Sequence, residues 1–341
     1  MTIEYRIPDL LGFVEEYRKP LNPHFDTLDA GFQKWVEEAS FLSASHKKAW
    51  KYSELPLLVA RTFPTADAAQ LHVCLESLMM FLILEQLTDP PATSEVSRKW
   101  AAEFVDAFQV PAEGAQKKEG PAAILQHLGN KVLAALDRPY RAGYIASNIL
   151  SAEGVVQEAL DREKYSESNP IPVHSYLDTR RKSLGALPFH ELALWIWKLD
   201  MLEEPVLKNA HIQVMVQAGL DMGLLANDLY SYRKEYLEDG ATHNFVNVAM
   251  HDPATSLKVG ETQAAIDYTA GEFTAALTRF KEHKKLLTFA EDGDMDLAAN
   301  VERYCELMMD SVAGNIEWSV ACKRYSLFPD EAARKAGIVK I

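Results

Sequence analysis

The sequence predicts an all-α protein that folds as one helical domain over residues 1–341. Apolar residues recur at helical spacing through long stretches of strong helix formers, whereas alternating runs of β-branched residues bounded by turns are nearly absent. The breakers between these stretches are short and evenly distributed, so no linker divides the chain into two domains. No repeat of solenoid length is present.

The predicted helices follow one another between clusters of Pro, Gly, Asp and Ser. These breakers read TDPPAT, VPAEGAQKKEG, SESNPIP, GALP and EDGDMD in chain order. The helices are predicted at residues 26–44, 67–87, 94–109, 121–136, 142–163, 174–183, 189–201, 208–238, 241–251, 259–287 and 294–324.

The composition and net charge of the chain limit which binding partners and which cellular location the protein is expected to have. With 48% hydrophobic and 25% charged residues the chain has an ordinary globular composition, and its net charge of −14 argues against nucleic acid or an anionic membrane as a partner. The most apolar run, residues 78–84, is too short to span a bilayer, and the first residues do not resemble a signal peptide. Cys74, Cys305 and Cys322 have no metal-ligand or redox spacing, which favours free thiols and a cytoplasmic location.

A stripe of polar side chains recurs in the segment ANDLYSYRKEYLEDG, residues 226–240. Asn227, Ser231 and Glu235 are spaced one helical turn apart, about 6 Å along the axis, so they share one face with Lys234. Their oxygens suit Mg²⁺ or Mn²⁺ rather than zinc. A lysine among metal ligands indicates that an anion such as a phosphate also binds there.

The same pattern would also suit a solvated helix face, and the residues upstream help to decide between the two interpretations. Leu220 and Gly223 continue the stripe as apolar and small residues, which is unusual for a surface helix. A polar edge that runs into an apolar one is typical of a pocket wall with a charged mouth.

A second polar cluster ends the apolar segment 67–89. Glu85 and Asp89 lie one turn apart, and the same face continues back through Phe81 as an apolar wall. A core helix that simply meets water at its end would give the same pattern. Two acids at a helix C-terminus oppose the macrodipole, so a bound cation would compensate them.

These two clusters resemble the metal-binding motifs of class I terpene synthases, particularly the fungal type. The family pattern N-D-x-x-S-x-x-x-E, often with Lys before the Glu, is matched by Asn227, Asp228, Ser231, Lys234 and Glu235. The resemblance implies a helical bundle around a central apolar cavity.

Further residues along the chain extend the resemblance. The family's diphosphate-sensing arginine would fall on Arg181, beside Arg180, and its linker and effector positions on Leu184 and Gly185. The family's C-terminal Arg-Tyr pair would be Arg324 and Tyr325.

Trp318 lies about two turns before this Arg-Tyr pair. Near the amino terminus, the segment NPH at 22–24 followed by Trp35 is also similar to the fungal members.

The aspartate-rich motif departs from the family pattern. It is usually D-D-x-x-D or D-E-x-x-D, and here it reads Glu85-Gln86-Leu87-Thr88-Asp89. A longer Glu85 can still reach a metal, and the amide of Gln86 can still form hydrogen bonds. The change could slow the enzyme, alter its products or leave an inactive relative.

The resemblance implies a Mg²⁺-dependent enzyme that ionises a prenyl diphosphate, farnesyl or geranyl, to an allylic carbocation and releases a terpene hydrocarbon or alcohol. The implied metal ligands are Glu85, Asp89, Asn227, Ser231 and Glu235. Arg181, Lys234, Arg324 and Tyr325 would bind the diphosphate. Phe81, Leu184, Gly185, Leu220, Gly223 and Trp318 would contact the substrate.

Two rival interpretations remain. A chain-elongating prenyl diphosphate synthase normally carries two D-D-x-x-D motifs, and this sequence has none intact. A helical protein that binds a prenyl diphosphate without ionising it would also fit the altered motif at Glu85 and Gln86. The sequence leaves monomer and homodimer equally open.

Overall fold

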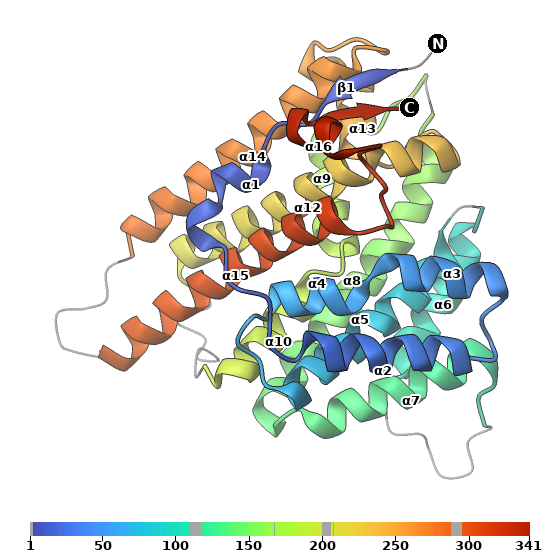
Figure 1. Cartoon of the computed structure of the whole chain (residues 1–341), viewed down its shortest axis with the longest axis vertical. Helices are drawn as coiled ribbons and strands as arrows, with labels where there is room; N and C mark the ends of the chain where they lie inside the picture. Colours follow the sequence, from blue (N-terminus) through green and yellow to red (C-terminus); the bar gives the residue numbers. More distant parts are fainter. Residues whose placement is uncertain are drawn as a thin grey trace. The chain divides into compact units, whose positions relative to one another are not determined.

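The computed structural model of the protein describes residues 3–89, 91–109, 117–166, 168–199, 206, 208–287 and 295–341. These residues form mostly α-helices, as the sequence predicts (Figure 1). The chain packs as two compact units: unit 1 is Met1–Pro20, Tyr165–Arg181 and Lys198–Ile341, and unit 2 is Leu21–Lys164 and Lys182–Trp197. Each unit therefore combines segments that are distant in sequence.

Unit 2 is built around the apolar helix α5. Its helices are α2 Phe25–Glu38, α3 Ala44–Ser53, α4 Leu55–Thr62, α5 Ala68–Thr88, α6 Ser94–Asp106, α7 Gly120–Ala135, α8 Arg138–Lys164 and α10 Leu187–Trp197. Helix α5 packs against α4, α6 and α7, while α8 packs against α6 and α10. Asp67 and Gln70 form a reciprocal capping box at the start of α5, so this core helix begins where the sequence predicts.

Helix α5 is longer than the apolar run 78–84 that it contains. By length and composition alone its 21 residues could cross a membrane. However, 67% of its most apolar window is buried inside the protein, as in the core helix of a globular fold.

Unit 1 is organised by the long helix α12. Its elements are β1 Glu4–Arg6, α1 Leu10–Phe13, η1 Glu15–Tyr17, α12 Ala210–Asp239, α13 Phe245–His251, η2 Pro253–Thr255, α14 Thr262–Lys285, α15 Met295–Ala321, α16 Glu331–Ala336 and β2 Ile338–Lys340. Helix α12 packs against α14 and α15. Helix α9, Val173–Ser183, begins in unit 1 and its last residues belong to unit 2.

Several parts of unit 1 differ from the sequence prediction, among them the helix predicted at 241–251, which begins only at Phe245, and the unpredicted helix α16. Strands β1 and β2 pair antiparallel, with Tyr5 opposite Val339, but each is too short for an alternating pattern to reveal it (Figure 1). The helix predicted to reach residue 324 ends at Ala321, so Arg324 lies in the turn that follows.

The helix predicted at 26–44 is present, but its predicted end is wrong. Helix α2 ends at Glu38, and α3 starts at Ala44, where the Ser43 side chain accepts a hydrogen bond from the His46 N–H. Glu54, with φ of 47°, then separates α3 from α4, a helix that the sequence analysis also missed. Local capping by Ser43 thus overrides the continuous helical composition of this segment.

A partly buried acid, Glu191, lies where α10 packs on α8. A side chain on Gly143 of α8 would collide with the Glu191 carboxyl of α10, so the glycine makes room for that carboxyl. Burial raises the pKa of Glu191 to about 7 from an ordinary value of 4.5. Around neutral pH the Glu191 carboxyl of the folded protein is therefore partly protonated, whereas that of the unfolded chain is ionised.

We expect this proton to make part of the protein's stability pH-dependent. As the pH falls from 8 to 5, the wild type should gain about 1–3 kcal/mol of unfolding free energy from Glu191, because its pKa is higher in the folded than in the unfolded state. Glu191→Gln lacks this titration. Urea unfolding of both proteins at pH 5 and pH 8 measures the difference, and parallel pH dependences would contradict it.

Candidate active site

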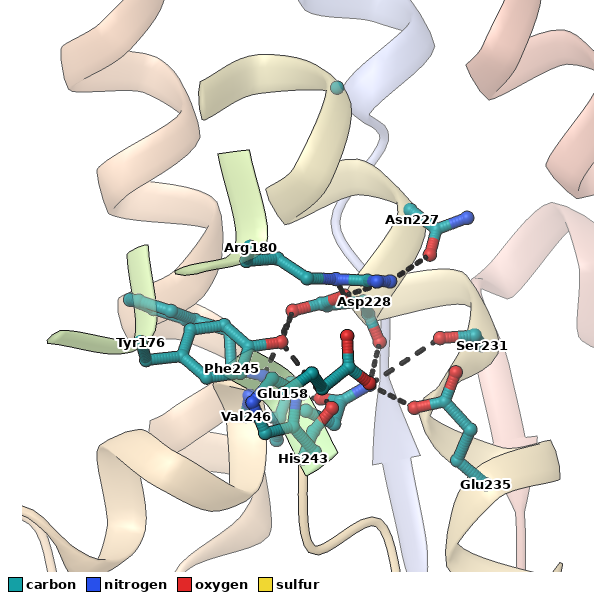
Figure 2. A network of polar contacts seen from close by, with 12 residues as sticks. Glu158, Tyr176, Arg180, Asn227, Asp228, Ser231, Glu235, His243, Phe245 and Val246 are labelled. Carbon is teal, nitrogen blue, oxygen red and sulfur yellow. Dashed lines mark hydrogen bonds and ion pairs between the residues drawn. The ribbon is translucent and has the colours of Figure 1, made fainter. Parts of the chain in front are cut away.

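The three oxygen ligands predicted from sequence follow one another along one face of α12 (Figure 2). Ser231 is buried, while Asn227 and Glu235 are partly buried. Asn227 is held from two sides, because its Oδ1 accepts from Arg180 Nη2 at 2.9 Å and its Nδ2 donates to the Tyr325 hydroxyl at 3.0 Å. The amide oxygen therefore has a fixed direction.

Asp228 lies on the buried side of the same helix. Its carboxylate accepts from the Tyr176 hydroxyl at 2.5 Å, from the Phe245 N–H at 2.9 Å and from Arg180 at 3.2 Å (Figure 2). Burial raises the pKa of Asp228 to about 6, whereas the Arg180 guanidinium favours the ionised form. Asp228 thus anchors α9 and α13 to α12.

Asn244, the residue that precedes α13, contacts the other two ligands. Its Nδ2 donates to Glu235 Oε2 at 2.9 Å, and Ser231 Oγ lies 3.4 Å away. The sequence analysis did not identify Asn244. An asparagine directly before an apolar helix is an N-cap signal, and this signal could have drawn attention to it.

The two adjacent arginines of α9 are held by different carboxylates. Arg181 donates to the buried Asp221 from Nε at 2.7 Å and from Nη2 at 3.3 Å, and to Asp178 from Nη1 at 2.8 Å. Arg279 of α14 also donates to Asp221, at 3.0 Å. The sequence analysis missed Asp221, although a lone acid in the apolar run AGLDMGLL is a sign of a buried partner.

The remaining cations predicted in unit 1 have other surroundings. Lys234 forms an ion pair with Glu238, one turn further along α12. Arg324 is partly buried in the turn after α15. Tyr325 beside it packs edge-on against the buried Trp318, with ring centroids 5.3 Å apart. The Tyr325 contact with Asn227 thus brings the end of α15 next to the first ligand.

The apolar continuation of the α12 stripe is only partly enclosed. Leu220 is buried. Gly223 is partly buried, and its carbonyl accepts from the Asn315 side chain at 3.3 Å.

In unit 2, Glu85 and Asp89 lie at the C-terminal end of α5, with Glu85 partly buried and Asp89 exposed. Arg162 of α8 donates to the Thr88 carbonyl at 3.0 Å. This guanidinium therefore supplies part of the positive charge that the sequence analysis assigned to a metal at this helix end.

Gln86 takes part in helix packing. Its Oε1 accepts from the Trp50 indole at 2.8 Å, and its Nε2 lies 3.1 Å from His46 Nδ1. Since an indole only donates, the amide must direct its NH₂ group at His46, whose Nδ1 accepts. The amide thus joins α5 to α3.

Two predicted substrate contacts of unit 2 touch each other. Gly185, with φ of 74°, lies in the break between α9 and α10 beside Leu184. A Cβ at Gly185 would lie 2.5 Å from the ring of Phe81, so only glycine fits both the backbone and the contact.

The donor chemistry of the α12 ligands suits a hard divalent cation. An amide oxygen, a hydroxyl and a carboxylate belong to the oxygen ligands that Mg²⁺ and Mn²⁺ prefer. Within the described ranges no three His, Cys, Asp or Glu side chains converge on one point. The α12 stripe is not a cluster of that kind, because two of its three oxygen side chains belong to an asparagine and a serine.

A helical chain with this oxygen-ligand stripe and paired arginines has the characteristics of a metal-dependent enzyme for diphosphates. The family model described as "Terpene synthase family 2, C-terminal metal binding" matches residues 77–279. The chain belongs to this family and is a terpene synthase.

Relatives and solved structures agree with this assignment. A Delta(6)-protoilludene synthase of Armillaria gallica is 27% identical over 330 residues, covering 94% of this chain and 88% of that protein. The sesquiterpene synthase Agr1 of Cyclocybe aegerita is 25% identical, covering 94% and 88%. The linalool/nerolidol synthase of Streptomyces clavuligerus, solved with 2-fluorogeranyl diphosphate, shares the fold, with a TM-score of 0.71, 15% identity and coverage of 88% and 100%.

The contact between Gly185 and Phe81 predicts a context-dependent loss of stability. Gly185→Ala should cost about 2–4 kcal/mol, from a strained backbone and a clash with the ring. Gly260→Ala is the matched control, because Gly260 has φ of 91° but open space around its Cβ position. It should cost only about 1–2 kcal/mol, the strain alone.

Chemical denaturation of these variants measures both costs. Replacing Phe81 by Leu should remove most of the excess cost of Gly185→Ala. Equal losses for Gly185→Ala and Gly260→Ala would show that the ring does not press on Gly185.

Proposed function

We propose that this terpene synthase ionises a prenyl diphosphate in the presence of Mg²⁺, or of Mn²⁺ in its place, to give an allylic carbocation and diphosphate. The observation that carries the proposal is the stripe of Asn227, Ser231 and Glu235, in which each donor is contacted by a neighbouring side chain. Ligands held in advance are expected of a site that binds a metal with a defined geometry.

Farnesyl diphosphate is the proposed substrate, with geranyl diphosphate as the alternative. The name of the Cyclocybe aegerita relative supports a fifteen-carbon substrate, and the bound 2-fluorogeranyl diphosphate in the Streptomyces enzyme supports the diphosphate class. The product is a sesquiterpene or monoterpene, as a hydrocarbon or an alcohol.

The metal would supply positive charge that stabilises the leaving diphosphate more as its bond to carbon breaks. In unit 1 its ligands would be Asn227, Ser231 and Glu235. In unit 2 we propose Asp89 and Glu85 as further ligands.

The cationic side chains would bind and orient the diphosphate. Arg181 already uses three of its five N–H donors on Asp221 and Asp178, which fixes the guanidinium plane before substrate arrives. Lys234 and Arg324 would add charge, and Tyr325 a hydroxyl donor. Because such groups need little reorganisation, they stabilise developing charge efficiently.

Apolar side chains would contact the isoprenoid chain and exclude water from the carbocation. In unit 1 we assign this role to Leu220, Gly223 and Trp318, and in unit 2 to Phe81 with Leu184 and Gly185. The rings of Phe81 and Trp318 would stabilise the positive charge by cation–π interaction. The whole chain would act as one domain, and three buried free cysteines support a cytoplasmic location.

The alternative function is that of a catalytically impaired protein that binds a prenyl diphosphate without ionising it. The change at Gln86 favours this alternative only if position 86 is a metal ligand. Its amide is instead bonded to Trp50 and positioned at His46, which supports the active enzyme.

We expect the purified protein to convert farnesyl or geranyl diphosphate into volatile terpenes when Mg²⁺ is present. Glu235→Ala should lower product formation by about 100-fold or more, because a group that stabilises the leaving charge is lost. Gas chromatography with mass spectrometry measures the products. Glu302→Ala, which removes an exposed carboxylate elsewhere in unit 1, is the control and should keep activity.

Two outcomes would decide against the proposal. Diphosphate binding without any product from either substrate would favour the impaired binding protein. Equal activity of Glu235→Ala and the wild type would remove Glu235 from the set of metal ligands.

A further inference from the structure

The side chain of Asn244 is fully buried and is fixed by hydrogen bonds on both of its polar atoms. Its Oδ1 accepts from the Val246 N–H at 3.0 Å and so caps helix α13. Its Nδ2 donates to the Asp228 carbonyl and to Glu235 Oε2, each at 2.9 Å. An amide NH₂ has two hydrogens, so these two acceptors account for both and the longer contact to Ser231 Oγ is secondary.

The end of helix α12 explains how Asn244 reaches these residues. Gly240, with φ of 80°, ends the helix, and the following Ala241 N–H donates back to the Glu235 carbonyl at 3.1 Å. The chain therefore reverses at once. This reversal places Asn244 against the last two turns of α12, beside the residues that precede it by only nine and thirteen positions.

The chemistry of the contact suits the task of holding a metal ligand. A lysine or arginine at this place would pair with the Glu235 carboxylate and cancel the charge that attracts a cation. A neutral amide orients the carboxylate and leaves its negative charge in place. The hydrogen bond engages Oε2, so Oε1 is not committed to Asn244.

We propose that Asn244 is a positioning residue for the metal site, which holds Glu235, and more weakly Ser231, in the orientation that binds a divalent cation. This inference rests on the proposed function, because it assigns Asn244 to the same ligands. Asn244 does not itself need to touch the metal or the substrate. Its effect passes through the hydrogen bond to Glu235.

The test must separate this role from the capping of α13. Asn244→Ser keeps an oxygen that can cap the helix, but its short side chain removes the NH₂ donor to Glu235. Asn209→Ser is the matched control, because Asn209 caps the start of α12 through the His211 and Ile212 N–H groups. Both substitutions replace an asparagine cap by a serine cap in unit 1.

The probe is Mn²⁺ with inorganic diphosphate, and the measurement is the loss of the free Mn²⁺ signal in electron paramagnetic resonance. We expect Asn244→Ser to weaken Mn²⁺ binding by about 10- to 100-fold, the usual cost of losing a partner of a metal ligand. Asn209→Ser should bind Mn²⁺ like the wild type. Thermal unfolding should show similar small losses of stability for both variants.

The outcomes distinguish this inference from the proposed function. If the wild type binds Mn²⁺ and Asn244→Ser binds it equally well, the proposed role of Asn244 is overturned while the proposed metal site stands. A wild type that does not bind Mn²⁺ would overturn the metal site and the role of Asn244 together. If Asn244→Ser does not fold, Asn244→Thr offers the same cap without the amide, and the same expectation applies to it.

Discussion

The arrangement of the polar stripe on α12 depends on the hydrogen bonds that the buried Asp228 carboxylate accepts. This carboxylate receives hydrogen bonds from Tyr176 and Arg180 of α9 and from the first N–H of α13, so three helices meet at one charge. A buried carboxylate that lost these partners would be strongly destabilising, by about 3–5 kcal/mol. The geometry around it is therefore strictly constrained, and the same Arg180 that pairs with Asp228 also directs the amide of Asn227. Asp228 thus fixes the position of Arg180, and Arg180 in turn orients the neighbouring Asn227.

A chain with a net charge of −14 needs local cations to hold a diphosphate, and the two adjacent arginines of α9 are already paired with acids. Arg180 and Arg181 are bound to Asp228 and Asp221, both of them buried carboxylates. Such pairing reduces the long-range attraction of an anion, but it fixes the direction of each guanidinium and leaves further N–H donors for a second acceptor. The paired guanidinium groups are therefore better suited to orienting a bound anion than to attracting it from a distance. Fixed donors of this kind would stabilise a leaving group whose charge increases during the reaction more than they would tighten binding of the substrate.

The sequence predicted the long helices and the stripe of Asn227, Ser231 and Glu235 because both follow from periodicity within one segment. The stripe on α12 is an i, i+4, i+8 pattern, and a single helix suffices to align it. The short helices α3 and α4 escaped prediction, since a serine cap and the left-handed Glu54 decide where they begin. Asn244 escaped for a different reason: the reversal at Gly240 places it, and no period connects it to Glu235. Likewise a rotation of about 100° between neighbouring helical residues sends Arg180 and Arg181 to different carboxylates, which a count along the chain cannot resolve.

The altered aspartate-rich motif shows how a departure from a family pattern can have a local cause. At position 86 the amide accepts from the Trp50 indole at 2.8 Å and places its NH₂ group 3.1 Å from His46 Nδ1, so this side chain connects α5 to α3. Gln86 therefore contributes to the packing of α3 on α5. The two acids that remain, Glu85 and Asp89, are still one turn apart at the end of α5. Losing the charge at 86 also lowers the repulsion among acids at a helix C-terminus, where the macrodipole already disfavours them. The position that changed therefore contributes to helix packing, while the two acids of the motif keep the spacing that places them on one face of α5.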